Sequence, residues 1–175
     1  MAENQESAPY VKPDLSLFGD EHVRRYRETD GEVGHEWNGV PCLVLATRGR
    51  RSGEQRSSAL IYGTDGDAFI VVASQGGAPT HPNWYHNLVA DPNVELQVGG
   101  EHIRARARTA EGDERTRLWR VMTAVWPNYD QYVLRTDRVI PVVVLERVEC
   151  RCRHAPTRSN TTTGMTRSVR STYWS

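Results

Sequence analysis

Two apolar runs flank an arginine-rich turn in residues 39–62, which read GVPCLVLATRGRRSGEQRSSALIY. The first run, residues 40–47, is short, continuous and rich in β-branched side chains, which is typical of a buried strand. Strand-like runs follow at residues 57–62 and 68–73, with the turn GTDGD at residues 63–67 between them. Asp and Gly between two such runs predict a hairpin.

After the hairpin, residues 74–82 predict a loop that opens a helix. The helix would span about ten residues, NWYHNLVADP, with Thr80 or His81 as its cap and Pro82 in its first turn. The remaining expected elements are strands at residues 94–98, 102–108 and 140–145, an amphipathic helix at residues 111–126 and a short helix after Pro127. The strand at residues 102–108 is expected to be half exposed, because Ile103, Ala105 and Ala107 alternate with arginines. This order of elements predicts an α+β fold, mainly β, in which a small closed or split barrel is capped by helices.

The chain divides into three parts. Residues 1–35 read as an N-terminal arm with a short helix at residues 20–29, whose only apolar side chains are Val23 and Tyr26. Residues 36–148 hold the barrel domain. Residues 149–175 are rich in Arg, Ser and Thr and bury too little surface to offset their ordering entropy, so disorder is predicted there.

Length and charge narrow the class of protein. With 175 residues the chain suits one domain with a core. Basic and acidic residues number 22 each, and because five arginines lie beyond residue 150, the remainder is mildly acidic. This argues against bulk nucleic-acid binding, and no apolar run approaches the roughly 20 residues of a membrane-spanning helix.

The cysteines and the N-terminus favour a reducing cytoplasm. Cys42, Cys150 and Cys152 have neither metal-ligand spacing nor the pattern of a disulfide framework, so no metal is expected. The first residues lack the basic start and apolar centre of a signal peptide.

Two loops have the composition of an anion site. Four arginines and two glycines in residues 48–56 could grip a phosphate or carboxylate with bidentate guanidinium groups, and a solvated basic turn is the alternative. Residues 74–77, SQGG, run into a helix start, where free amides and the helix dipole favour an anion or an electron-rich ring. An ordinary strand-to-helix connection is the alternative there.

Two aromatic clusters follow. Residues 81–87, HPNWYHN, offer rings on which a heterocycle could stack, although Trp84 and Leu88 are also spaced as core residues. Tyr129 and Tyr132 share a helix face with Trp126 nearby, and their phenols could donate hydrogen bonds to an oxygen that gains charge. By spacing alone, packing against the barrel mouth explains this cluster equally well.

Together, three segments resemble a known family in order and spacing. They are residues 39–62 as quoted above, residues 71–98 (VVASQGGAPTHPNWYHNLVADPNVELQV) and residues 124–148 (AVWPNYDQYVLRTDRVIPVVVLERV). The chain is similar over about residues 36–148 to the deazaflavin-dependent nitroreductases and quinone reductases of mycobacteria and other actinobacteria. The resemblance implies a split β-barrel of the FMN-binding type and an oxidoreductase that passes hydride from reduced coenzyme F-420 to a quinone or nitroaromatic acceptor.

The resemblance also implies roles for single residues. Coenzyme binding falls to Arg50, Arg51, Arg56, Ser57, Ser58, Ser74, Gly76, Gly77, Ala78, Trp84 and Asn87, with the arginines meeting the anionic side chain and Trp84 and Asn87 walling the ring. The catalytic group is Tyr129, Tyr132 and Ser74, which would orient the acceptor and donate a proton. The acceptor pocket takes its shape from these tyrosines together with Trp37 and Trp126.

Alternatives remain open on sequence alone. The same barrel type holds FMN in other enzymes, so an FMN reductase is one alternative, and a non-catalytic carrier or sensor of the deazaflavin is another. The long arginine row favours the deazaflavin, because its oligoglutamate tail carries more negative charge than the single phosphate of FMN. A peripheral contact of the helix at residues 20–29 with the inner face of the cell membrane is a further hypothesis, and the oligomeric state is not predicted.

Overall fold

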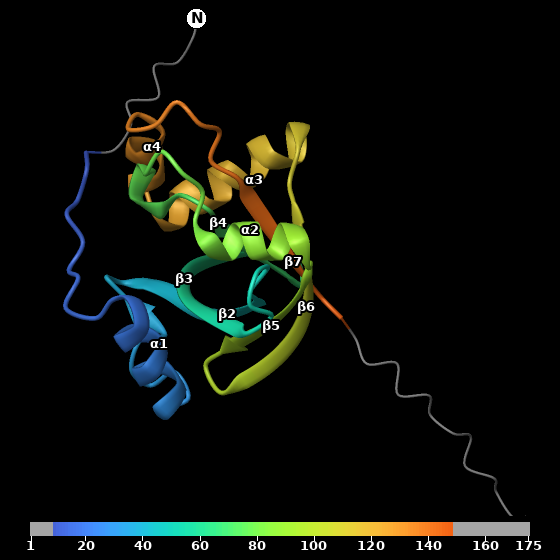
Figure 1. Ribbon diagram of the computed structural model, residues 1–175. Coiled ribbons are helices and arrows are strands. Elements are labelled where there is room, and N and C mark those ends of the chain that lie inside the picture. The colour runs from blue at the N-terminus through green and yellow to red at the C-terminus, as the bar shows by residue number, and fades with distance from the viewer. Residues whose placement is uncertain (1–8, 149–175) are drawn as a thin grey trace, which may run out of the picture.

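The computed structural model describes residues 9–148, which form a barrel of strands with helices around it (Figure 1). The strands are β1 (Glu36–Trp37), β2 (Val40–Arg48), β3 (Gln55–Asp65), β4 (Ala68–Val72), β5 (Asn93–Val98), β6 (Glu101–Thr109) and β7 (Val142–Arg147). The helices are α1 (Gly19–Glu28), α2 (Asn83–Ala90), α3 (Gly112–Val125) and α4 (Asn128–Val133), with a short 3-10 helix, η1 (Gln75–Gly77), between β4 and α2. The tail predicted to be disordered lies outside the described residues.

Six of the strands close into a barrel. β2 pairs with β3 on one side and with β5 on the other, and the antiparallel pairs β3–β4, β4–β7, β7–β6 and β6–β5 complete the circle. Closing a sheet on itself removes the free edges that an open sheet exposes. The predicted α+β fold, a small barrel capped by helices, is confirmed.

The strands carry apolar residues on both faces because there is a core on each side of the sheet. In β4, Phe69 and Val71 belong to the barrel interior, whereas Ile70 packs on the outside with Leu118 and Met122 of α3. Burying each such side chain contributes about 1.5–3 kcal/mol. This double burial explains why the sequence shows continuous apolar runs here, while β6 alternates between buried and exposed residues as predicted.

Helix α1 is held at one end of the barrel by a buried phenol. The Tyr26 hydroxyl accepts a hydrogen bond from the Gly99 amide at 2.7 Å, donates to the Cys42 carbonyl at 3.0 Å and lies 2.8 Å from Nδ1 of His35. Tyr26 is fully buried and Val23 nearly so. Both apolar side chains of this helix therefore pack against the barrel, which leaves neither of them free to touch a bilayer.

The structure corrects several expected boundaries. Helix α2 begins at Asn83 with Pro82 as its N-cap residue, so the expectation of Thr80 or His81 as cap was wrong. The strands of the first hairpin run to Asp65 and restart at Ala68, so the turn has two residues and not five. β1 was not predicted, because two residues carry no measurable periodicity.

Within residues 9–148, no helix combines the length and the apolar character that a membrane crossing requires.

Candidate functional site

An extended segment crosses the outside of the barrel from α4 to α1, and we call residues 10–18 the N-terminal strap (Figure 1). Two asparagine side chains pair with its backbone, and Nε1 of Trp37 donates to its Leu17 carbonyl at 2.7 Å. Asn128 accepts from the Val11 amide at 2.9 Å and donates to the Val11 carbonyl at 2.6 Å. Asn38 does the same for Asp14, at 2.8 and 3.0 Å. Each carboxamide thus takes the place of a neighbouring strand in pairing with the backbone.

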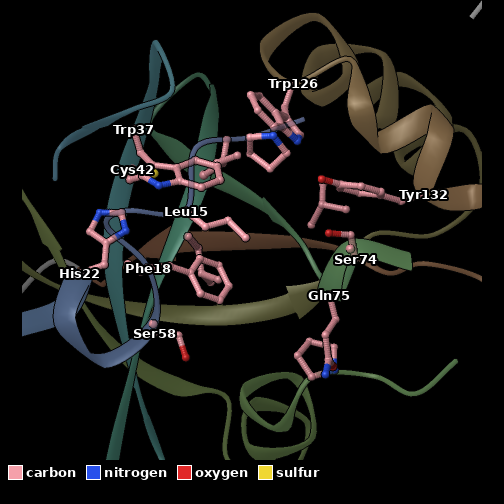
Figure 2. A pocket seen from close by; sticks show the side chains of 18 of the residues that line it. Leu15, Phe18, His22, Trp37, Cys42, Ser58, Ser74, Gln75, Trp126 and Tyr132 are labelled. Atoms are coloured by element: carbon pink, nitrogen blue, oxygen red, sulfur yellow. The ribbon is translucent and has the colours of Figure 1, made fainter. Parts of the chain in front are cut away.

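A cavity of about 510 Å³ lies between the strap and the barrel, within the usual size range of small-molecule sites. Its aromatic walls are contributed by Tyr10, Phe18, Trp37, Trp126, Tyr129 and Tyr132. The rings of Trp37 and Trp126 are 5.7 Å apart. In Figure 2, Ser74 and Tyr132 face the cavity from one side and Trp37 faces it from the other. The cavity suits a flat aromatic molecule with a few polar contacts.

A second cavity, of about 470 Å³, lies beside the first, along the arginine-rich turn. The two cavities share Ser58 and Trp84 as lining residues, so they adjoin, and we call the first the aromatic end and the second the basic end of the site. The basic end is lined by Arg50, Arg51 and Arg56.

The basic turn is held in place by Asn87 of α2. Its side-chain oxygen accepts from the Arg50 amide at 3.2 Å and from Nη1 of Arg50 at 3.3 Å. Its nitrogen donates to the Thr47 hydroxyl at 3.2 Å. Because Asn87 is buried, these bonds fix the start of the turn to the barrel wall. Arg56 meets Glu54 at 2.6 Å in an exposed ion pair, which an incoming anion can exchange at little cost.

The turn after β4 brings backbone to the cavity. Gln75, Gly76 and Gly77 all have positive φ, at 46°, 63° and 82°. A Cβ on Gly77 would lie 2.7 Å from the Tyr132 carbonyl oxygen, so this position requires glycine. A Cβ on Gly76 would meet nothing within 4 Å, and Gly76 lines the cavity. The backbone at Gly76 is therefore open to a ligand that lies flat against it.

The two tyrosines of α4 stand together. Their rings are 6.1 Å apart in an edge-to-face arrangement, and both residues are buried except where they line the cavity. Burial raises the pKa of Tyr129 well above its ordinary value. Its phenol therefore stays protonated and can donate a hydrogen bond into the cavity.

The structure brings together most of the residues singled out in the sequence. Those lining the aromatic end are Ser57, Ser58, Ser74, Gly76, Trp84, Tyr129 and Tyr132. Those lining the basic end are Arg50, Arg51, Arg56 and Asn87, together with Ser58 and Trp84. Gly77 and Ala78 line neither end, because Gly77 packs under α4 and the Ala78 carbonyl accepts a hydrogen bond from Arg138.

Sequence reasoning missed the strap residues and Arg138. Tyr10, Leu15 and Phe18 line the cavity although they stand in a polar arm. The available signal was a group of five apolar residues between Pro9 and Gly19, namely Tyr10, Val11, Leu15, Leu17 and Phe18. Across residues 9–148 there is no group of three or more His, Cys, Asp or Glu side chains arranged to hold a metal ion, and the sequence expectation of no metal stays a prediction.

A closed antiparallel barrel with an aromatic cavity, a glycine turn and an adjoining basic groove has the layout of split-barrel oxidoreductases that use flavin-like coenzymes. The family model described as F-420H(2)-dependent quinone reductase matches residues 19–147. The chain belongs to this family. The predicted resemblance, the oxidoreductase class and coenzyme F-420 as the family's cofactor are confirmed.

Individual relatives agree with the family match. The chain is 42% identical over 130 residues to the F-420H(2)-dependent quinone reductase Rv1261c of Mycobacterium tuberculosis, which covers 72% of this chain and 87% of the relative. Among solved structures, one described as an F-420-H2-dependent reductase (FDR-A) has 37% identity and a TM-score of 0.57, covering 61% of this chain and 94% of its own. Another, described as a domain-swapped dimer, has 35% identity and a TM-score of 0.60, covering 71% of this chain and 96% of its own.

Proposed function

We propose that the chain binds reduced coenzyme F-420 along the two adjoining cavities and reduces a quinone held under the strap. The observation that carries this proposal is that an aromatic and a basic cavity adjoin, because Ser58 and Trp84 line both of them. A coenzyme with a flat ring and a long anionic side chain matches that division. The residues present fit this coenzyme. The exposed arginines around Arg50 suit its anionic side chain, and the buried aromatic walls and the open backbone at Gly76 suit its ring.

The basic end would hold the side chain. Arg51 and Arg56 present exposed guanidinium groups, and Arg50 is fixed by Asn87. A guanidinium fork meets phosphate or carboxylate with two parallel hydrogen bonds. Ser57 and Ser58 line the cavity beside this row, where they would add hydroxyl contacts.

The aromatic end would hold the ring. Trp84 would wall it, and Ser74 and Gly76 would contact it from the turn after β4. Gly77 and Ala78 line neither cavity and would contribute by keeping that turn in its observed conformation. Asn87 would contribute chiefly by fixing Arg50, since both atoms of its carboxamide already have protein partners.

The chemistry divides between coenzyme and protein. Bound reduced coenzyme supplies the hydride, and a quinone becomes a hydroquinone when it gains one hydride and one proton. Tyr132, Tyr129 and Ser74 would orient the acceptor and donate hydrogen bonds to the oxygen that gains charge. The strap and the two tryptophans would exclude water from the reacting face.

In this proposal the strap, and not α1, contacts the membrane. Leu15 is 55% exposed and Phe18 is 63% exposed, and both border the cavity. Apolar side chains at the cavity mouth suit a protein that collects a quinone from the bilayer surface. Equal sedimentation with quinone-loaded vesicles of the unmodified chain and of a Leu15→Ser, Phe18→Ser variant would contradict this part.

The deciding experiment titrates the purified protein with coenzyme F-420 and, separately, with FMN, and follows fluorescence. Micromolar or tighter binding of the deazaflavin, followed by oxidation of the reduced complex on addition of menadione, is the expected result. Preference for FMN would favour a flavin reductase, and tight deazaflavin binding without turnover of several quinones would favour a carrier or sensor. The Tyr132→Phe variant should lose turnover while its coenzyme affinity is unchanged.

A further inference from the structure

Arg138, which lies between α4 and β7, donates hydrogen bonds to the backbone of the turn that follows β4. Its Nε donates to the Ala78 carbonyl at 2.8 Å, and Nη2 donates to the carbonyls of Ala73 and Ser74 at 3.1 and 2.8 Å. Its Nη1 lies 2.9 Å from Nδ1 of His81. One guanidinium group therefore reaches four acceptors on a stretch of nine residues.

This turn needs support from outside itself. Three successive residues, Gln75, Gly76 and Gly77, have positive φ, a conformation that is disfavoured for the side chain of Gln75. The bonds within the turn run from the Gly77 amide to the Ser74 carbonyl and from the Ala78 amide to the Gln75 carbonyl. Both of these are local bonds, so neither fixes the turn relative to the barrel. Arg138 bonds to the carbonyls on either side of the strained residues and so holds both ends.

We propose that Arg138 is a positioning residue for the coenzyme, because it fixes the turn through which Ser74 and Gly76 face the cavity. The inference rests on the proposed function, which places the coenzyme ring against that turn. A planar guanidinium can meet acceptors in several directions at once, whereas the single ammonium of lysine cannot. Arg138 lines neither cavity and acts only through the backbone that it holds.

The contact with His81 makes the interaction between Arg138 and the turn sensitive to pH. Because Nη1 of Arg138 is a donor, Nδ1 of His81 must be the acceptor, and the ring proton must sit on Nε2. A protonated ring would turn an N–H and a positive charge toward the guanidinium. The rings that face His81 are Tyr85 at 5.0 Å and His86 at 5.8 Å, and neither brings a negative charge.

The direction of the pH effect follows from the same contacts. Burial, then Arg138, then His86 lower the pKa of His81 below its ordinary 6.5. The neutral ring and its bond to Arg138 therefore persist at pH 6.5 and above. Both are lost as the pH falls through the lowered pKa, where coenzyme affinity should decrease.

The test compares the unmodified chain with Arg138→Met, His81→Gln and, as control, Arg117→Met. Arg117 forms an exposed ion pair with Asp65 at the far end of β3. The measurements are the Kd of oxidised coenzyme F-420 and the hydrogen exchange of the coenzyme-free protein. Arg138→Met should raise the Kd about tenfold and speed exchange of the amides of residues 74–78 about tenfold, whereas the control changes neither.

The His81→Gln variant separates positioning from a general loss of stability. A glutamine oxygen accepts from Arg138 without titrating, so the ratio of its Kd to that of the unmodified chain should change only on the acid side of pH 6.5. Taking the ratio cancels any titration of the coenzyme itself. Equal pH dependence of the two proteins, or turn amides that exchange no faster in Arg138→Met, would overturn the inference. Absence of coenzyme binding by the unmodified chain would instead refute the proposed function, and the exchange data would still decide whether Arg138 holds the turn.

Discussion

Replacing Asn128 with alanine removes one of the two asparagine side chains that pair with the backbone of the N-terminal strap. The Asn128 carboxamide makes two hydrogen bonds with the Val11 backbone, and the residue is only 3% exposed. Loss of both bonds should leave the barrel intact, because they connect the strap to α4 and do not enter the sheet. We expect the strap to detach more often and the acceptor cavity to lose one wall.

The size of the effect follows from those two bonds. A net hydrogen bond contributes about 0.5–1.5 kcal/mol. Val11 is itself 64% exposed, so water can satisfy its backbone once the strap opens, which places the loss at the lower end of the summed range, about 1–2 kcal/mol. That corresponds to an increase of about 5- to 30-fold in the open population of the strap.

Hydrogen exchange of the Val11 amide reports this population directly, and it should accelerate by the same about 5- to 30-fold factor. The KM for menadione should rise by a larger factor than the Kd of coenzyme F-420, because strap residues line the aromatic end and none lines the basic end that holds the anionic side chain. Asn93→Ala is a matched control, since within residues 9–148 its side chain bonds to Asp91 beside β5 and not to the strap. Unchanged exchange at Val11 in a folded Asn128→Ala protein, or an equal loss of coenzyme affinity, would refute this account of the strap.

Three further outcomes are expected. Tyr26→Phe leaves the half-buried Gly99 amide without its acceptor, so the free energy of unfolding in urea should fall by about 1–3 kcal/mol; a smaller change than about 0.5 kcal/mol would mean that water replaces the phenol. Arg51→Gln should weaken coenzyme binding by about fivefold and reduce its dependence on salt concentration, and an unchanged salt dependence would place the anionic side chain elsewhere. Burial raises the pKa of the Cys42 thiol to about 12, so iodoacetamide at pH 8 should label Cys42 only after denaturation, as read by site-resolved mass spectrometry.

Much of the fold could be predicted from the sequence, because the order of apolar and polar residues along a segment reflects which of its side chains are buried. The alternation of Ile103, Ala105 and Ala107 with arginines predicted a half-exposed strand, and β6 has that pattern. Asp and Gly predicted the first hairpin, although its turn proved shorter, since residues with turn propensity can also extend a strand when a partner is present.

The candidate site was predicted less completely. The arginine row and the α4 tyrosines were recognised because each lies within one short segment. Asn87 was expected to wall the ring, whereas its carboxamide is occupied by Arg50 and Thr47, and no local pattern distinguishes those two situations. Its contact with the coenzyme stays a prediction.

By itself, the sequence determined the class of fold, the positions of most strands and helices and the family, because apolar periodicity and motif spacing are properties of adjacent residues. Three features depend on the tertiary structure alone. They are the pairing of β2 with β5 that closes the barrel, the hydrogen bond between Val11 of the strap and Asn128, which lie 117 residues apart in the sequence, and the hydrogen bonds of Arg138 to the turn after β4. Hydrogen bonds between distant residues leave no periodic signature, since any polar side chain at the right place in space can make them.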